Sequence, residues 1–271
     1  IEPGSLVRVP FGSGIRTGVV VGPGAAGESP RDKLKRIESR IDLPPLPPDW
    51  LDLCRFVSRY YQSPLGTVMS MALPPLLRQG KLKTRVYGCS TLTDYKRWSN
   101  TGVRYAFGNA MLRVGCLKGY ADGSLGSTTA WLFEPYLDDP KSTGLAGEDI
   151  PKTPELVLAA DKAGLQINIH AIGDKANATI LDIYEQTAKT NGPRDRRFRI
   201  EHAQHLRQRD IPRFGSLKVV ASMQPFHIID DGRWAWKRLD EKRLKGTYAF
   251  RTLLDTGAVL AFGSDSPVAP L

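Results

Sequence analysis

Four polar residues that could take part in metal or acid–base chemistry each lie at the end of a short apolar run. They are Lys118, His170, His202 and Asp265. Neutral imidazole and carboxylate groups suit a divalent metal such as Zn²⁺, and an open coordination position can hold water. A bound metal lowers the pKa of that water towards ~7, and a neighbouring carboxylate can accept its proton. Residues of these types therefore indicate metal-dependent hydrolysis if the fold brings them together.

The elements that must position these residues alternate between strand and helix. Residues 165–169 alternate and are rich in β-branched side chains, which is typical of a buried parallel strand, and a Gly-Asp turn after His170 opens a helix. Strands are predicted at 83–88, 112–118, 165–169, 197–202, 218–224 and 258–265, and helices at 94–100, 154–163, 175–189, about 208–214 and 243–255. Repeated strand–helix units predict an α/β fold of the (β/α) barrel type, whose active site lies at the carboxyl ends of the strands.

Composition limits the class of protein. The chain has 271 residues, of which 41% are hydrophobic, enough for one barrel or for two smaller domains. No apolar run approaches the ~20 residues of a membrane helix, so no membrane association is expected. Three widely spaced cysteines, at positions 54, 89 and 116, favour a reducing, cytoplasmic location.

The net charge of +10 raises the question of a nucleic-acid partner. Residues 1–81 contain 11 Lys and Arg residues against 7 Asp and Glu residues, and residues 82–271 contain 27 against 21. The first segment is therefore denser in positive charge, although a solvated basic surface is the simpler interpretation of charge alone.

The first 80 residues carry a distinct pattern. Residues 5–22 predict two strands joined by a glycine-rich turn, and a helix with Asp49 as N-cap follows a Pro-rich spacer at 44–48. The order resembles the N-terminal 3′-end DNA-binding domain of the primosomal replication-restart helicases (primosomal protein N′). The resemblance is carried by Val7–Gly12, Gly18–Val21, Leu34–Ile37, Tyr60-Tyr61, Pro64–Gly66 and Ala72–Gly80.

This resemblance implies a small β-rich α+β domain at residues 1–81 that receives a DNA 3′ end. Gly12 and Lys35 match two positions that line the family's pocket, and a cation near a terminal phosphate suits that task. The pocket's aspartate belongs to a strand that would precede Ile1, and turn formation or solvation alone would also explain Gly12 and Lys35. No Gly-x-x-x-x-Gly-Lys-Ser/Thr loop occurs, so helicase activity is excluded for this chain.

Residues 82–271 resemble the amidohydrolase superfamily, specifically its YtcJ-like amidohydrolase-3 group. Six ordered blocks carry the resemblance: Lys118–Gly126, Pro135-Tyr136, His170–Asp174, Arg199–Gln204, Ser222–Pro225 and Phe262–Val268. It implies a metal-dependent enzyme that hydrolyses an amide-type C–N bond in a small substrate. By this resemblance His170 and His202 are metal ligands, Asp265 is a ligand or the general base, and Lys118 is a catalytic residue and ligand that can be carboxylated to bridge a second metal.

Further residues have assigned roles and open alternatives. Asp122, Ser124, Gln224 and His227 are predicted to contact substrate, and His205 is predicted to be a surface or second-layer residue. Lys118 could equally form a salt bridge at the rim, Asp265 could cap a helix, and Trp234 and Trp236 could either cover the site or simply pack.

The superfamily's His-x-His pair is absent, because the histidines at 170, 202, 205 and 227 contain no such spacing. About six of eight barrel units are expected, so the barrel should be open, with two edge strands that need oligomerisation or a partner. Three hypotheses therefore stand: a hydrolase whose activity the missing strand would impair, a DNA-end binding module, or a non-native fusion of two truncated segments with neither full activity.

Overall fold

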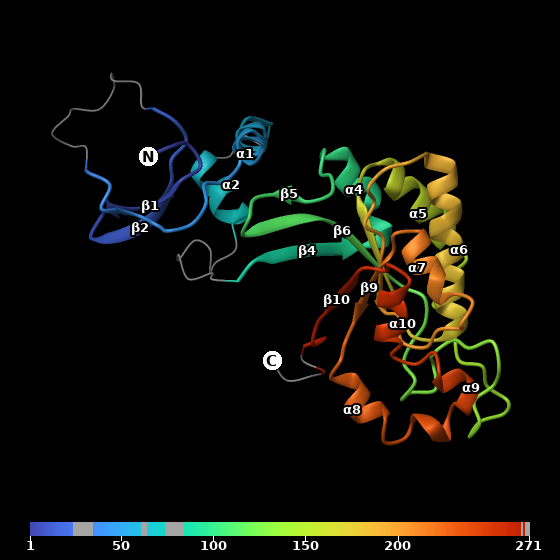
Figure 1. The fold of residues 1–271 in the computed structure, drawn as a ribbon. Coiled ribbons are helices and arrows are strands. Elements are labelled where there is room, and N and C mark those ends of the chain that lie inside the picture. The colour runs from blue at the N-terminus through green and yellow to red at the C-terminus, as the bar shows by residue number, and fades with distance from the viewer. Residues whose placement is uncertain (24–34, 61–63, 74–83, 267, 269–271) are drawn as a thin grey trace. The chain divides into compact units, whose positions relative to one another are not determined.

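The computed structural model describes residues 1–23, 35–60, 64–73, 84–266 and 268. The chain forms two compact units, one of residues 1–88 with 106–114 and one of residues 89–105 with 115–271. Figure 1 shows the elements of both units, coloured along the chain.

The first unit is built on a small antiparallel sheet. Its strands β1 (Leu6–Phe11), β2 (Gly14–Val19) and β3 (Ser39–Arg40) lie in the order β2-β1-β3. Phe11 pairs with Gly14, so two residues form the turn, and Gly12 has the positive φ of 61° that glycine adopts easily. The predicted hairpin is therefore confirmed, and β3 adds a third strand of two residues.

Two helices complete this unit: α1 (Pro48–Tyr60) and α2 (Leu65–Ala72). Leu51 and Cys54 on α1 pack against Met69 on α2. A second cluster joins Leu6 of β1 to three side chains from the loops and helix ends, namely Ile41, Leu46 and Leu73. These two apolar clusters hold the helices and the sheet of the unit together.

The larger sheet has the strand order β10-β9-β8-β7-β6-β4, with β5 paired to β6. Its strands are β4 (Val86–Thr91), β5 (Phe107–Gly108), β6 (Leu112–Tyr120), β7 (Gln166–Ala171), β8 (Arg199–His202), β9 (Val220–Met223) and β10 (Leu260–Phe262). Neighbours from β6 to β10 are parallel and follow the chain order. Sequential parallel pairing with helical connections confirms the incomplete α/β barrel.

Helices connect these strands. They are η2 (Leu92–Asp94), α4 (Tyr95–Asn100), α5 (Thr153–Lys162), α6 (Asp174–Asn191), α7 (Ile211–Ser216), α8 (His227–Asp231), η3 (Ala235–Lys237), α9 (Glu241–Leu244) and α10 (Phe250–Asp255). In Figure 1, α5, α6 and α7 lie on one side of the parallel strands. The ring of Tyr184 on α6 stacks on Phe198 with centroids 4.3 Å apart, and its hydroxyl donates to the Arg199 carbonyl at 2.9 Å. This contact fixes α6 against the start of β8.

The helix predicted over 243–255 is wrong in its middle. Residues between α9 and α10 turn back to the loop after β8, where Leu206 donates to the Gly246 carbonyl at 2.9 Å and Tyr248 donates to the Gln204 carbonyl at 2.8 Å. A Cβ at Gly246 would overlap the Leu206 carbonyl oxygen, so only glycine fits this approach. The short elements α8 and η3 lack a sequence prediction.

Cys89 at β4 and Cys116 on β6 form a disulfide, a pairing that their separation of 27 residues does not reveal. Cys54 is free and buried. Within the described residues, β10 and β4 lie at the two ends of the strand order. They are therefore the two edge strands of the predicted open barrel. No helix among the described residues is long and apolar enough to span a membrane.

Candidate active site

A cavity of about 500 Å³ opens where the parallel strands end. Each of β6, β7 and β8 supplies one of the predicted residues, and the loop after β10 supplies another. The predicted residues that line the cavity are Lys118, Ser124, His170, His202, His227 and Asp265. The parallel register explains this, because Tyr120 of β6 pairs with His170 and Ala171 pairs with His202.

Three side chains in the cavity form a group that could hold a metal ion. His202, His227 and Asp265 each offer one ligand atom, and these atoms lie within 4.8 Å of one another. His202 Nδ1 and His227 Nε2 are both buried without a hydrogen-bond partner among the described residues. Two unpartnered imidazole nitrogens beside a carboxylate fit a divalent cation well, because burying a polar atom without a partner costs free energy.

Burial favours the metal-binding form of the His202 imidazole. Desolvation lowers the pKa of His202 to about 3, and the charges of His170 and Lys118 act in the same direction. The ring is therefore neutral at neutral pH, as a ligand must be. Asp265 is exposed and has a positive φ of 55° in the turn after β10.

His170 lies beside this group but is not one of its three members. Its ring centroid is 4.5 Å from that of His202, and its Nε2 lies 2.9 Å from the Gly123 carbonyl oxygen. A carbonyl only accepts, so Nε2 carries the proton and donates. Burial lowers the pKa of His170, which keeps the ring neutral.

Lys118 is half-buried, with Nζ 5.0 Å from the centroid of the Tyr120 ring. Burial lowers the pKa of its ammonium to about 8, while Glu201 and Asp265 oppose the shift. A pKa in this range gives a larger share of neutral amine at neutral pH than an exposed lysine has.

The Asp122 carboxylate is used inside the protein and is not among the cavity-lining residues. It accepts backbone N–H groups from Trp131 at 2.9 Å, Ile172 at 3.0 Å and Gly173 at 2.7 Å. Burial raises its pKa to about 7, and these three donors act in the opposite direction. Asp122, which was expected to contact substrate, thus connects the loop after β6 to the turn after β7 through hydrogen bonds.

The other predicted contacts differ in placement. Ser124 lines the cavity, where its hydroxyl lies 2.8 Å from that of Ser127. Gln224 is buried, donates to the Ser222 carbonyl at 3.2 Å, and does not line the cavity. His205 is only 2% exposed, which excludes the surface alternative of its prediction and leaves the second-layer one.

Comparison with known proteins supplies the family. Residues 75–271 match the model of the amidohydrolase family. The chain belongs to the amidohydrolase family. The Arabidopsis thaliana protein LONG AFTER FAR-RED 3 is 52% identical over 161 residues, which is 59% of this chain and 28% of that protein. The putative amidohydrolase YtcJ of Bacillus subtilis (strain 168) is 36% identical over 160 residues, which is 59% of this chain and 30% of that protein.

A solved structure agrees with this family match. An uncharacterized metal-dependent hydrolase from Pyrococcus horikoshii OT3 superposes with a TM-score of 0.63 and 36% identity, covering 72% of this chain and 38% of that one. The chain spans less than a third of the length of each of the two curated relatives named above.

The N-terminal residues match a second model. Residues 1–74 match the 3′ DNA-binding domain. Replication restart protein PriA of Haemophilus influenzae (strain ATCC 51907 / DSM 11121 / KW20 / Rd) is 39% identical over 82 residues, which is 30% of this chain and 11% of that protein. Gly12 lies in the exposed turn after β1, and Lys35 is exposed ahead of β3.

The lining residues that the sequence did not predict include two that are joined by a hydrogen bond, Gln204 and Asp231. Asp231 Oδ2 accepts hydrogen bonds of 2.6 Å from both Gln204 and the Tyr248 hydroxyl, and Gln204 and Asp231 both line the cavity. Gln204 ends the Arg199–Gln204 block, so its signal was present. Asp231 has no local signal, because α8 brings it to the site. Trp234 also lines the cavity, whereas Trp236 is 59% exposed.

Proposed function

We propose that this chain hydrolyses an amide-type C–N bond of a small molecule with the help of a divalent metal, Zn²⁺ by the choice of donors. The observation that carries the proposal is the cluster of His202, His227 and Asp265, with two buried imidazole nitrogens that have no hydrogen-bond partner among the described residues. The printed description of the Pyrococcus structure as a metal-dependent hydrolase supports it.

Two ligand sets are open within this proposal. His202 and Asp265 belong to both sets, and the third imidazole is that of His227 or of His170. The geometry favours His227, because the ligand atoms of His202, His227 and Asp265 lie within 4.8 Å of one another and His170 is not part of this group. His170 and Lys118 then lie at the edge of the site, where Lys118 could become a ligand on carboxylation.

The chain's own residues have defined tasks in this reaction. A bound metal supplies Lewis acidity and a water of lowered pKa. The exposed Asp265 carboxylate can accept a proton from water and pass it to the leaving nitrogen. Asp231, with its carboxylate fixed by Gln204 and Tyr248, offers an acceptor for a substrate N–H. The Trp234 side chain limits water at one wall of the cavity.

The test is metal content together with hydrolysis. Purified protein titrated with Zn²⁺ by calorimetry should bind about one ion per chain, and His202→Asn should weaken binding at least about tenfold. Release of p-nitroaniline from p-nitroacetanilide should require metal, stop after chelation and return with Zn²⁺. Failure of the wild-type protein to bind Zn²⁺ would contradict the proposal.

Carboxylation of Lys118 is a separate part of the proposal. A neutral amine is the form that reacts with carbon dioxide, and the lowered pKa of Lys118 increases its share. Protein prepared in ¹³C-bicarbonate should give a carbamate carbon signal that disappears in Lys118→Met. Lys162→Met, at an exposed residue of α5, is the matched control and should keep the signal.

A second function is proposed for the N-terminal segment: binding of a DNA 3′ end. The match of residues 1–74 to the 3′ DNA-binding model favours it. Fluorescence anisotropy should show tighter binding to a duplex with a recessed 3′ hydroxyl than to the same duplex with a 3′ phosphate. Equal affinity for both ends would leave only nonspecific charge attraction.

A further inference from the structure

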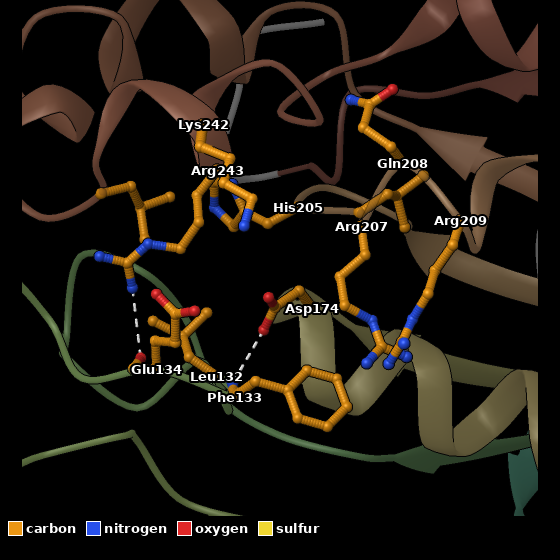
Figure 2. Close-up of a pocket in the computed structure, with 12 residues that line it drawn as sticks. Leu132, Phe133, Glu134, Asp174, His205, Arg207, Gln208, Arg209, Lys242 and Arg243 are labelled. Carbon is orange, nitrogen blue, oxygen red and sulfur yellow. Dashed lines mark hydrogen bonds between the residues drawn. The ribbon is translucent and has the colours of Figure 1, made fainter.

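The second unit contains another cavity, of about 540 Å³, away from the proposed metal site. Figure 2 shows the residues that line it. They are Leu132, Phe133, Glu134, Asp174, His205, Leu206, Arg207, Gln208, Arg209, Leu239, Lys242 and Arg243. None of them lines the candidate active site. The cavity therefore needs an explanation of its own.

Two of its four basic side chains are held in place by other contacts. The Arg207 guanidinium lies 3.9 Å from the centroid of the Phe133 ring, and its Nε donates to Asp210 at 2.6 Å. Arg243 Nε donates to Asp240 at 2.7 Å, and its Nη1 donates to the Pro135 carbonyl at 2.8 Å. These contacts orient both guanidinium groups and use only part of their donors.

The other two basic side chains, Arg209 and Lys242, are exposed, and neither forms an ion pair with a described residue. In Figure 2 the side chains of Arg207 and Arg209 extend in the same direction from the segment after β8. The lining has four basic side chains against two acidic ones, Glu134 and Asp174, so an excess of positive charge remains for an anion to neutralise. The arrangement favours a carboxylate or phosphate as the ligand group.

The acidic and apolar residues narrow the class of ligand. Asp174 Oδ1 accepts the Phe133 N–H at 3.0 Å, and burial raises the pKa of this carboxyl. Asp174 begins the 18-residue helix α6, whose amino end adds positive potential. The side chains of Leu132, Leu206 and Leu239 give an apolar wall. The exposed Phe133 ring offers a face for stacking.

We propose that this cavity binds a small organic anion, with a carboxylate or phosphate group held by Arg207, Arg209 and Lys242 and an apolar or aromatic body against Phe133. The binding does not depend on the metal. The bound anion is a ligand different from the substrate of the proposed hydrolysis.

The experiment measures binding of benzoate, phenyl phosphate and neutral benzamide to the full chain by calorimetry without added metal. The two anions differ from benzamide mainly in charge, so at least one should bind about tenfold more tightly or better. Binding of benzoate alone assigns a carboxylate ligand, and binding of phenyl phosphate alone assigns a phosphate ligand. Anions that bind no better than benzamide would overturn the proposal.

Variants locate the binding. Arg209→Gln and Lys242→Gln should each weaken anion binding by about fivefold and leave the affinity for benzamide unchanged. Both side chains are exposed and would contribute to binding only through their charge. Lys245→Gln, an exposed lysine just after α9 that does not line the cavity, is the matched control and should bind like the wild type. An anion affinity that Arg209→Gln and Lys242→Gln leave unchanged would place the anion elsewhere and overturn the assignment.

Discussion

His205 shows how burial and two neighbours set the protonation state of one residue. Its Nδ1 lies 2.9 Å from the Thr247 hydroxyl, and its Nε2 lies 3.1 Å from Gln204 Nε2. Gln204 Nε2 also donates to Asp231, so this atom is the amide nitrogen and His205 Nε2 must accept. The Nδ1–H tautomer follows, and a second proton would face another donor. Burial accordingly lowers the pKa of His205 to about 3.

This lowered pKa predicts a loss of stability in acid. A histidine whose folded pKa lies below its unfolded value of about 6.5 stabilises the fold fully above pH 6.5, and this contribution falls as pH drops towards 3. The free energy of unfolding should decrease by up to about 1.4 kcal/mol per pH unit through this residue. The free energy of unfolding of His205→Gln, measured in urea between pH 4 and 6, should change less with pH than that of the wild type. An equal slope in both proteins would contradict the assigned cause.

The choice between His227 and His170 as ligand is also a question at the scale of residues. If His227 completes the site, His227→Asn should weaken Zn²⁺ binding by about 10- to 100-fold, because the remaining donors leave the site incomplete. His170→Gln should have a smaller effect, because His170 is not one of the three residues whose ligand atoms lie within 4.8 Å of one another. Zinc calorimetry on both variants decides between them, and the opposite order would assign His170.

The turn between β7 and α6 shows how an element depends on one position. Gly173 donates to Asp122, and a Cβ at this position would overlap the Trp131 carbonyl oxygen. Gly173→Ala should therefore destabilise the second unit by about 1–3 kcal/mol, because backbone must move. Gly126→Ala is the control, since its Cβ would meet the Trp234 ring at an ordinary 3.7 Å. Thermal unfolding should separate the two variants.

Sequence patterns predicted β7, β9 and β10 well, because each contains alternating or consecutive apolar residues. They predicted β4 less well, since the strand expected at 83–88 is Val86–Thr91. Ile167 and Ile169 of β7 are almost completely buried, as the run predicts. The same patterns could not predict α8, whose side chains are mostly exposed, or the break at Gly246, which depends on a distant carbonyl. The cavity was predictable from strand ends, whereas the approach of His227 to His202 depends on α8. Exposed short elements therefore account for most of the differences.

At the scale of the whole molecule, two segments with different family matches share one chain. The 3′ DNA-binding match ends at residue 74 and the amidohydrolase match begins at residue 75, close to the predicted division at 81 and 82. Each unit has its own buried cluster and its own candidate residues. Since no candidate residue is shared, the two proposed activities should be energetically independent. The cytoplasmic location and the covering of the open sheet edges by another copy or a partner stay predictions.

Independence can be measured with one variant in each segment. Lys35 is exposed, so Lys35→Gln should weaken binding to a recessed 3′-end duplex by about two- to fivefold and reduce the slope of affinity against salt by about one. It should leave Zn²⁺ affinity unchanged. His202→Asn should show the reverse, with zinc binding weakened and DNA binding as in the wild type. The double variant should carry both losses, each equal to that of its single variant, because free energies at separate sites add. A zinc affinity that changes when the DNA site is saturated would instead show that the two segments are coupled.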